Sequence, residues 1–358
     1  MPHSASSPTP ASPARQAGSA LLARGVGLAL GVAADQVLGD PHRHHPVAWY
    51  GSAASRLEER LWADSRARGV AYAAACLAPL ALAGAVVESA SRRRLVLRTL
   101  TTAVTTWAVL GARSLADEGL LMADRLESDD LGLARDQLGH LCGRDPSGLD
   151  QPELARATVE SLAENTADAA VASLLWGALA GVPGLLVHRG ANTLDAMVGH
   201  RTARHAHFGT AAARLDDLLD LLPARMTGLL AVAAAPLVGA DPGRAWRILR
   251  RDHARHPSPN GGWCESAWAG ALGVQLGGRN VYPGGRVEHR PLLGDGPRPD
   301  AAAVRTAASL VTAVTVAATA AAAIGLAGVG HLLARDASLT ARLRRIVRRR
   351  SRARKEHR

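Results

Sequence analysis

Long apolar runs that recur from one end of the chain to the other constrain its fold more than any other feature. The clearest covers residues 304–333 and contains no acidic side chain. A helix needs about 20 predominantly apolar residues to cross a bilayer core. No segment shows sustained alternation of apolar and polar residues, and only helices and closed barrels satisfy their backbone hydrogen bonds in lipid. The sequence therefore predicts an all-α fold, a polytopic integral membrane helical bundle with polar helical loops.

Six segments are candidate spans, and two of them are weak. The third is short and carries Arg98, and the fourth is interrupted by Gly181 and Pro183, so we expect one of the two to be re-entrant or interfacial. A soluble protein with buried helices is the alternative, but the first and last segments are too long and too uniformly apolar for it. In chain order the candidates are residues 21–38, 70–87, 95–111, 171–187, 218–238 and 304–333.

The composition agrees with a membrane bundle. Hydrophobic residues make up 47% of the chain and aromatic residues only 3%, so Ala, Leu, Val and Gly supply most of the apolar content. Small residues let membrane helices pack closely, whereas a large soluble core usually draws on aromatic bulk. We expect a multi-pass protein of the inner (cytoplasmic) membrane, with residues 21–335 as the membrane-embedded domain.

The positive charge is concentrated at the C-terminal end. Residues 341–358 hold nine Arg and one Lys against one Glu, which is +9 of the formal net charge of +11. A basic run after an apolar span is typical of a cytoplasmic tail that faces anionic lipid. No recognised nucleic-acid motif accompanies it, so we expect the lipid bilayer and no nucleic acid as a partner. Residues 336–358 are predicted to be a basic tail and the Ser/Pro-rich residues 1–20 to be disordered.

The charge distribution leaves the topology open. If all six segments cross and the tail is cytoplasmic, residues 112–170 and 240–303 lie outside. Residues 244–255 are themselves rich in Arg, which favours the inside. The two expectations conflict, and the sequence does not decide between them.

Two kinds of chemistry are excluded by the residue types present. Lys355 is the sole lysine, so neither a GxxxxGK[ST] phosphate loop nor a buried Schiff-base lysine is possible. Cys76, Cys142 and Cys264 show no CxxC spacing, which excludes a disulfide framework or a zinc ribbon. Nucleotide phosphates would have to be bound by Arg, backbone amides and a metal ion.

Three carboxylates share one face of a predicted helix. Glu160, Glu164 and Asp168 recur every four residues, and no basic residue interleaves at that spacing. Like charges so placed destabilise an isolated helix, and a solvated acidic face is the alternative interpretation. We favour a Mg²⁺ site, because Mg²⁺ is bound by oxygen ligands, commonly one or two carboxylates with substrate phosphate.

A second acidic group stands at the start of the fifth candidate span. Asp216, Asp217 and Asp220 suit a cation. Arg214 and Arg225 flank them and suit a carboxylate or phosphate, because the guanidinium group pairs bidentately with both. An internal Arg–Asp ion pair that closes the helix end remains equally open.

Two histidine-containing segments are further candidates. Residues 39–46, which include His45, combine Asp and His as a metal or acid–base site would, although a helix-ending turn explains them equally well. His256 opens the stretch HPSPNGG, whose prolines and glycines favour a turn with amides exposed to an anion.

Together, five stretches resemble the CobD/CbiB family of cobalamin biosynthesis. They occur in the family's order, and the resemblance extends over roughly residues 20 to 335. Where the family usually has Asn after the Asp pair, this chain has Asp220. The stretches are GDPHRHHPV from Gly39, ESLAENTAD from Glu160, ANTLDAMVGHR from Ala191, ARLDDLLDLLPAR from Ala213 and HPSPNGGWCESAWAGALGVQLGG from His256.

The resemblance implies an integral-membrane ligase. It would attach (R)-1-aminopropan-2-ol or its phosphate to the carboxyl of (adenosyl)cobyric acid, with ATP and Mg²⁺, and it could associate with other corrinoid-pathway enzymes. An unactivated carboxylate does not form an amide in water, so an acyl phosphate is expected first, which requires cation stabilisation of phosphoryl charge.

On that reaction, each candidate residue receives a predicted role. The metal ligands are Glu164, Asp168, Asp216 and Asp217. The catalytic residues are His45 or His256 as general base, with Glu160 and Arg225. The substrate-binding residues are Asn165, Asn192, Arg214, Ser258 and Asn260.

Two other functions stay open. A non-enzymatic AmpE-like membrane signalling protein is one, because the family also resembles that type, but the ENTAD and PSPN stretches favour the enzyme. A membrane transporter is the other, because intramembrane acids and broken helices also mark transport sites. No internal repeat is evident between the two halves, which counts against transport.

Overall fold

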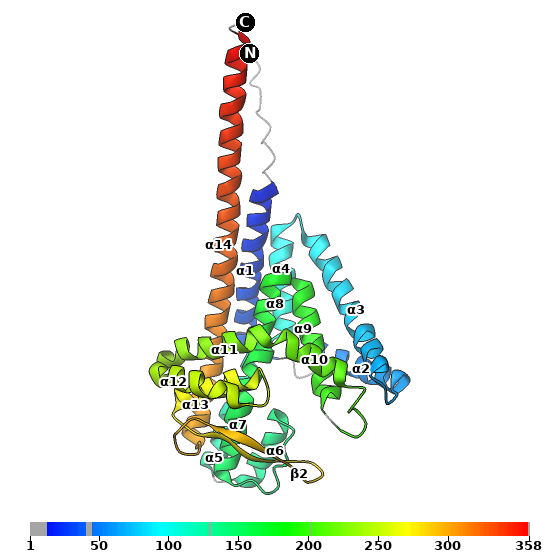
Figure 1. Ribbon diagram of the computed structural model, residues 1–358, viewed down its shortest axis with the longest axis vertical. Helices are drawn as coiled ribbons and strands as arrows, with labels where there is room; N and C mark the ends of the chain where they lie inside the picture. The colour runs from blue at the N-terminus through cyan, green and yellow to red at the C-terminus, as the bar shows by residue number, and fades with distance from the viewer. Residues whose placement is uncertain (1–12, 41–44, 129, 201, 357–358) are drawn as a thin grey trace.

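A computed structural model describes residues 13–40, 45–128, 130–200 and 202–356. The helices form an elongated bundle with a polar lobe at one end (Figure 1). Within the described residues, five helical segments are long and apolar enough to cross a bilayer. The predicted all-α, multi-pass membrane fold is therefore confirmed. The five segments are Gln16–Leu38, Arg66–Ser91, Leu95–Glu127, Leu221–Val238 and Ala301–Arg335.

The bundle contains α1, α3, α4 and α14, which run along the long axis (Figure 1). Helices α1 and α14 lie antiparallel and in extensive contact. A Cβ atom added to Gly18 would lie 2.6 Å from the carbonyl oxygen of Gly330, so the two glycines allow the backbones to approach closely. The bounds are α1 Pro13–Leu38, α3 Arg66–Ser91, α4 Leu95–Val109 and α14 Ala301–Glu356.

The two ends of the chain differ in part from the sequence prediction. Helix α1 begins at Pro13, so the second part of the segment predicted to be disordered is helical, and residues 1–12 lie outside the described range. At the other end, α14 continues through most of the predicted tail to Glu356. The Ala-rich and Arg-rich sequences on either side of residue 336 both favour helix, which explains this continuity.

The fourth predicted span is a helical hairpin. Helix α8 (Ala172–Ala180) ends at Gly181, and α9 (Val182–Leu194) runs back beside it. Gly181 has φ +71° and ψ −146°, a conformation that essentially only glycine adopts, and Pro183 stands at the second position of α9. This fourth segment is the one that turns back, while the third forms α4 along the bundle.

The fifth predicted span lies across the bundle. Helix α11 (Leu221–Ala234) runs roughly perpendicular to α1 and α14 at the level where the bundle meets the lobe (Figure 1). Other helices gather at the same level, and Trp49 of α2 and Trp246 of α12 are exposed there. They are α2 (Pro46–Leu61), α10 (Thr210–Leu219) and α12 (Pro242–Asp252), with the 3₁₀ turns η3 (Ala235–Val238) and η4 (His253–Arg255).

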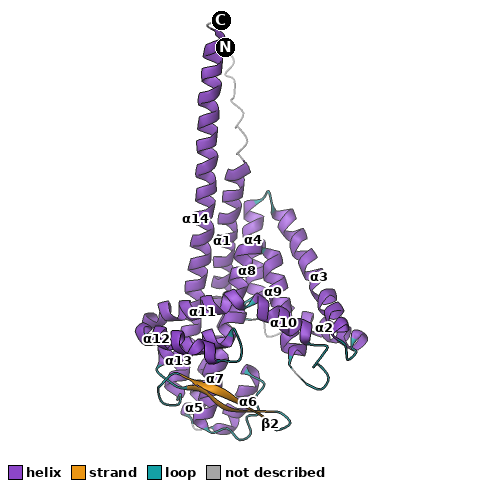
Figure 2. Cartoon of the chain, in the orientation of Figure 1, coloured by secondary structure: helices purple, strands orange, loops and turns teal. Residues whose placement is uncertain are grey.

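The lobe contains a β-hairpin that the sequence did not predict. Strands β1 and β2 pair antiparallel across it (Figure 2). The expectation of no strand is wrong here, because Gly277 and Gly278 have positive φ and shift the register, which breaks the alternation that predicts strands. The bounds are β1 Leu276–Tyr282 and β2 Arg286–Leu293.

Helices surround this hairpin and build a continuous core with the bundle. Leu154, Leu162, Trp268 and Val311 are fully buried in it. The lobe helices are α5 (Ala112–Glu127), α6 (Leu131–Leu141), α7 (Gln151–Thr166) and α13 (Gly261–Leu272).

The fold separates the lobe from the basic end of the chain. Helix α14 begins in the lobe and ends at the opposite end of the bundle (Figure 1). A membrane crossed by α1 and α14 would separate the lobe from the last turns of α14, so only one of them could face the cytoplasm.

Candidate functional site

A cavity of about 190 Å³ lies where the hairpin of α8 and α9 meets the lobe. Six carboxylate side chains line it, together with Asn165, Ser258 and Asn260. The four predicted metal ligands are all among these acids, which we call the acid cluster. Its members are Glu164, Asp168, Asp195, Asp216, Asp217 and Asp220.

Three segments far apart in sequence bring the acid cluster together. Glu164 ends α7, and Asp168 lies in η1 (Ala167–Val171), a π-helical turn that joins α7 to α8. Asp195 begins a second π-helical turn, η2 (Asp195–Gly199), at the end of α9. Single π turns inside helices are rare and concentrate at functional sites. Both turns lie at this cavity, which marks it as the candidate site.

The third segment is the junction of α10 and α11. Asp216 and Asp217 are in the last turn of α10, and Asp220 connects it to α11. Carboxylates near a helix C-terminus face the negative end of the helix dipole, so they are unfavourable there without a cation.

The electrostatics of the acid cluster are those of carboxylates that repel one another. Burial, reinforced by Asp220 and Asp195, raises the pKa of Asp216 to about 8. Burial and the nearby Asp220, Asp216 and Glu164 raise the pKa of Asp168 well above its ordinary value. Asp195 and Asp217 also have raised pKa values, chiefly through burial. Within the described chain no arginine forms a salt bridge with these four aspartates.

The donor set fits a divalent cation that binds oxygen. Oδ1 of Asp216, Oδ2 of Asp220 and Oδ1 of Asn260 are buried and have no hydrogen-bond partner. A buried polar atom without a partner is costly, and Mg²⁺ takes oxygen ligands from carboxylates and phosphates. Asp220 is only 2% exposed, so its unpaired oxygen has no access to bulk water.

Asn192 links the first acidic segment to the third. Its side chain acts on both Asp168 and Asp216 and lowers the pKa of each, against the effect of burial. Arg189, one turn earlier on α9, lies 3.5 Å from the Asn192 side-chain oxygen. The amide nitrogen of Asn192 therefore donates toward the two carboxylates, and the asparagine orients them rather than lining the cavity itself.

Glu160 lies elsewhere, although it was predicted as a catalytic residue from the same acidic face. It is fully buried, pairs with Arg144 and Arg156, and accepts a hydrogen bond of 2.6 Å from the Gly277 amide. Burial alone would raise its pKa, but the two arginines and that amide lower it to about 2. Glu160 therefore anchors α7 to β1 as a permanent anion.

His256 sits beside the cavity in a second charged group. Its Nε2 lies 3.3 Å from Glu265 and 3.1 Å from Arg290, and its Nδ1 accepts from the Ser258 amide. Glu164, His256 and Glu265 place ligand atoms within 4.8 Å of one another, as a metal site would. Arg290 already supplies a cation to both glutamates, so we assign this group as an ion-pair network and not as a second metal site.

The loop after His256 closes one side of the cavity. The Ser258 hydroxyl accepts hydrogen bonds from the amides of Asn260 and Gly261. Asn260 donates to the Asp217 carbonyl over 2.8 Å. The amides predicted to bind an anion are thus partly satisfied within the loop, and the free oxygen of Asn260 is its group for a ligand.

The remaining predicted residues lie at the edge of the site or outside it. Asn165 lines the cavity and donates to Ser161. His45 caps α2 and lies 3.5 Å from Asp40, while its neighbour His44 is outside the described residues. Arg214 is exposed, and Arg225 bonds the Leu221 carbonyl and stacks on Trp263, so neither lines the cavity.

Several residues near the cavity carry no sequence-based prediction. His188 is buried and lies 3.0 Å from Oδ1 of Asp220, which leaves the other oxygen facing the cavity. Arg290 reaches the site from the unpredicted strand β2. Asp195 lies in the stretch ANTLDAMVGHR, which resembles the family. It was not predicted as a metal ligand, because no other acid stands near it in the sequence.

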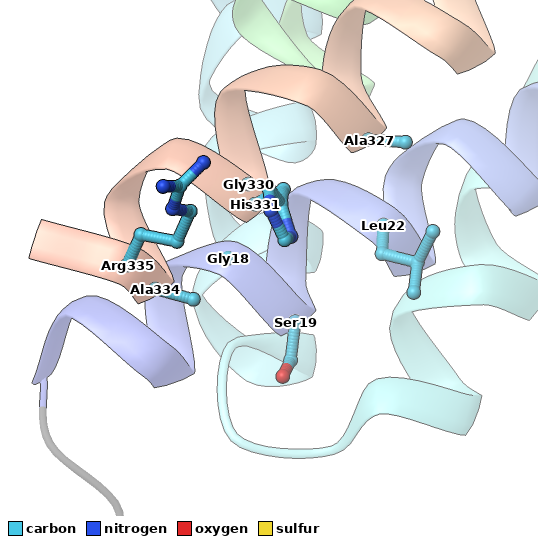
Figure 3. A pocket seen from close by; sticks show the side chains of 8 residues that line it. All are labelled: Gly18, Ser19, Leu22, Ala327, Gly330, His331, Ala334 and Arg335. Carbon is cyan, nitrogen blue, oxygen red and sulfur yellow. The ribbon is translucent and has the colours of Figure 1, made fainter. Parts of the chain in front are cut away.

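A larger groove of about 730 Å³ lies at the other end of the bundle, between α1 and α14 (Figure 3). It is lined by small residues such as Gly18 and Gly330, with Ser19, His331 and Arg335 at its edge. None of its described lining residues is a carboxylate or a buried polar side chain, so the acid cavity is the better candidate for chemistry.

Comparison with known proteins identifies relatives over most of the chain. The family model described as "CobD/Cbib protein" matches residues 28–311. The chain is 48% identical over 287 residues to "Cobalamin biosynthesis protein CobD" of Mycobacterium tuberculosis (strain ATCC 25618 / H37Rv), covering 80% of this chain and 91% of that protein. Proteins of the same name from Geobacter metallireducens and Rhodobacter capsulatus are 45% and 43% identical, covering 76% and 72% of this chain and 87% and 80% of their own lengths. No solved structure gives a significant match.

Proposed function

Because the chain belongs to the CobD/CbiB family of cobalamin biosynthesis, we propose that it is the ligase that attaches aminopropanol to a corrinoid. The proposed reaction joins (R)-1-aminopropan-2-ol, free or O-phosphorylated, to the carboxyl of (adenosyl)cobyric acid. ATP would supply the energy: the carboxylate oxygen attacks the γ-phosphorus, ADP leaves, and the amine then displaces phosphate from the acyl phosphate with loss of one proton.

The acid cluster is the observation that carries this proposal. Six carboxylates converge on a cavity, with unpaired buried oxygens, and no arginine of the described chain forms a salt bridge with four of them. Mg²⁺ bound there would neutralise the charge on phosphoryl oxygens. The ion would be held by the four predicted ligands, Glu164, Asp168, Asp216 and Asp217. Asp195 and Asp220 line the same cavity and would be further oxygen ligands.

The cavity volume limits what can enter. About 190 Å³ is below the range of about 300–1,000 Å³ that is typical of small-molecule sites. A corrin ring is too large for it. We therefore propose that the propionate arm, the amine and the terminal phosphate meet in the cavity while the ring stays outside on the surface around it.

The proton released by the amine needs an acceptor near the cavity. His256 lies beside Glu164 and Glu265, and Glu265 has a pKa raised to about 7, by burial first and then by Glu160 and Glu164. We propose that the His256–Glu265 pair accepts that proton, because its ligand atoms lie within 4.8 Å of those of Glu164, a member of the acid cluster. The free side-chain oxygen of Asn260 would accept a hydrogen bond from a donor group of the substrates, and Asn165 lines the cavity beside it.

The proposed substrates set the orientation in the membrane. ATP and corrinoid intermediates are cytoplasmic, so we propose that the lobe faces the cytoplasm across an inner membrane. The arginines of α12 at the lobe side of the bundle agree with that orientation. The C-terminal end of α14 would then lie on the other side, against the expectation of a cytoplasmic tail.

Growth and turnover test the proposal together. A strain that lacks this step and is fed cobyric acid should grow when it carries this gene, and cobinamide should support it without the gene. Membranes that contain Glu164→Gln or Asp217→Asn should lose most corrinoid conversion. Failure of the wild-type gene to support growth on cobyric acid, in a strain that responds to cobinamide, would refute the assignment.

A further inference from the structure

The turn between α8 and α9 is surrounded by charged side chains from three membrane helices. Arg24 of α1, Glu88 of α3 and Arg98 of α4 meet there, and we call them the tip cluster. Their side chains are 10%, 19% and 9% exposed. Glu88 lies three residues before the end of α3 and Arg98 three residues after the start of α4, so the hairpin reaches deep into the bundle.

The tip cluster binds the backbone of the turn on both sides. Arg24 donates to the carbonyls of Ala178 and Leu179, over 2.9 Å and 3.3 Å. Glu88 accepts from the Val182 amide over 3.3 Å and pairs with Arg24 over 2.7 Å. Arg98 pairs with the same Glu88 oxygen.

These contacts match the chemistry of the two helix ends. The last carbonyls of α8 and the first amides of α9 have no partner within their own helices. The C-terminus of a helix carries partial negative charge and the N-terminus partial positive charge, so Arg24 and Glu88 each stand at the favourable end. Backbone that is not helical is tolerated at membrane depth only where protein satisfies it.

The two arms that leave this turn carry the acid cluster at their other ends. The first arm is one continuous helical run back through η1 to α7, with Asp168 and Glu164. The second arm is α9, with His188 and Asn192 on it and Asp195 after it. His188 lies 3.0 Å from one oxygen of Asp220, and Asn192 acts on both Asp168 and Asp216.

We propose that Glu88 is a positioning residue for the cation site: with Arg24 and Arg98 it fixes the turn of the re-entrant hairpin. That turn sets how α9 lies against α8, and thereby where His188 and Asn192 hold the acid cluster. The inference rests on the proposed cation-binding function of that cluster, although Glu88 itself lies about two helical turns or more from it.

The first test measures the Mn²⁺ affinity of purified, full-length protein in detergent. Electron paramagnetic resonance reports the concentration of free Mn²⁺ during the titration. We expect Glu88→Gln to weaken Mn²⁺ binding by about 10-fold or more, as loss of an orienting partner does at other metal sites. Glu127→Gln is the matched control, because Glu127 also pairs with an arginine, Arg305, but on the lobe surface. Unchanged Mn²⁺ affinity in monodisperse Glu88→Gln protein would overturn the proposal.

A second pair of variants tests the turn without removing a charge. A Cβ atom on Gly181 would lie 2.5 Å from Glu88 and 2.8 Å from Arg24, so Gly181→Ala should disturb the tip cluster and weaken Mn²⁺ binding likewise. Gly239→Ala is the control, because Gly239 has the same φ of +71° and its Cβ would contact nothing within 4 Å. Loss of assembled protein in both Glu88→Gln and Gly181→Ala would overturn the positioning function in favour of a purely structural one.

These outcomes separate the inference from the proposed reaction. Wild-type protein that binds Mn²⁺ but converts no corrinoid would refute the reaction and leave the positioning function standing. Wild-type protein that binds no Mn²⁺ would refute the cation site and the inference with it.

Discussion

Glu160 and Glu164 lie one turn apart on the same helix, yet they have opposite environments. Glu160 is fully buried between Arg144 and Arg156 and also accepts a backbone hydrogen bond. Glu164 faces a cavity with five aspartates, and its arginine partner, Arg290, lies 3.9 Å away. A paired buried carboxylate stabilises the fold as long as its partners remain, whereas an unpaired cluster is stable only with a cation or with bound protons. The comparison separates a structural acid from candidate functional acids on one helix face.

The largest expected effect comes from removing charge from the unpaired group. In the double variant Asp168→Asn with Asp216→Asn, we expect cation binding and corrinoid conversion to fall by about 100-fold or more, because charge stabilisation at the phosphoryl group is lost. The same change should raise the thermal stability of metal-free protein at pH 8, since the repulsion is removed. Conversion as a function of Mg²⁺ and thermal unfolding in EDTA check both effects, and a fall in both stability and conversion would contradict the distinction between the two glutamates.

The paired group should respond in the opposite way. Glu160→Gln leaves Arg144 and Arg156 without their counter-ion, and breaking such a buried pair costs about 3–5 kcal/mol of stability. The midpoint of thermal unfolding should fall clearly, while Mn²⁺ affinity of the protein that remains folded stays the same. Glu127→Gln, at an exposed ion pair worth about 0–1 kcal/mol, should leave both quantities unaffected.

The pH dependence of stability sharpens the comparison further. The pKa of Asp216 is about 8 in the folded protein and about 4 in an unfolded chain, so the folded protein binds the Asp216 proton more tightly. The stability that this proton contributes is lost as the pH rises from about 4 to about 8. Glu160, with its pKa lowered to about 2, contributes stability that is lost only in strong acid. In EDTA, the unfolding midpoint should therefore fall as pH rises from about 5 to 8. Saturating Mg²⁺ should suppress that fall, and the same slope with and without Mg²⁺ would argue against cation binding by the acid cluster.

The smallest effect is expected at Arg214. It is exposed and outside the cavity, although the sequence predicted it as a phosphate or carboxylate ligand. Arg214→Gln should change the KM for ATP by less than about two-fold, as a surface substitution typically does. A large rise in KM would show that substrate phosphate extends beyond the cavity toward α10.

The acidic residues were largely predictable, and their partners were not. Glu164 and Asp168 stood out because carboxylates recur there at helical spacing without interleaved basic residues, and Asp216 and Asp217 because they stand at the start of an apolar span. All four line the cavity. Glu160 belonged to the same pattern, and its partner Arg156 stands at the visible i, i+4 spacing on the same helix. Its other partners were not predictable from local spacing, because Arg144 lies 16 residues earlier and Gly277 is 117 residues away. For the same reason Arg290 could not be foreseen, because it reaches the site from a hairpin whose glycines disguise the strands.

The sequence by itself determined the membrane helices, because long uninterrupted apolar runs have few other stable solutions in water or lipid. It also determined which oxygen-rich segments were candidates for a cation. The tertiary structure alone decided that the fourth apolar run turns back at Gly181 and that α11 lies across the bundle. It also decided that Glu160 and Glu164 have different partners, because each of these outcomes depends on contacts between residues far apart in the chain.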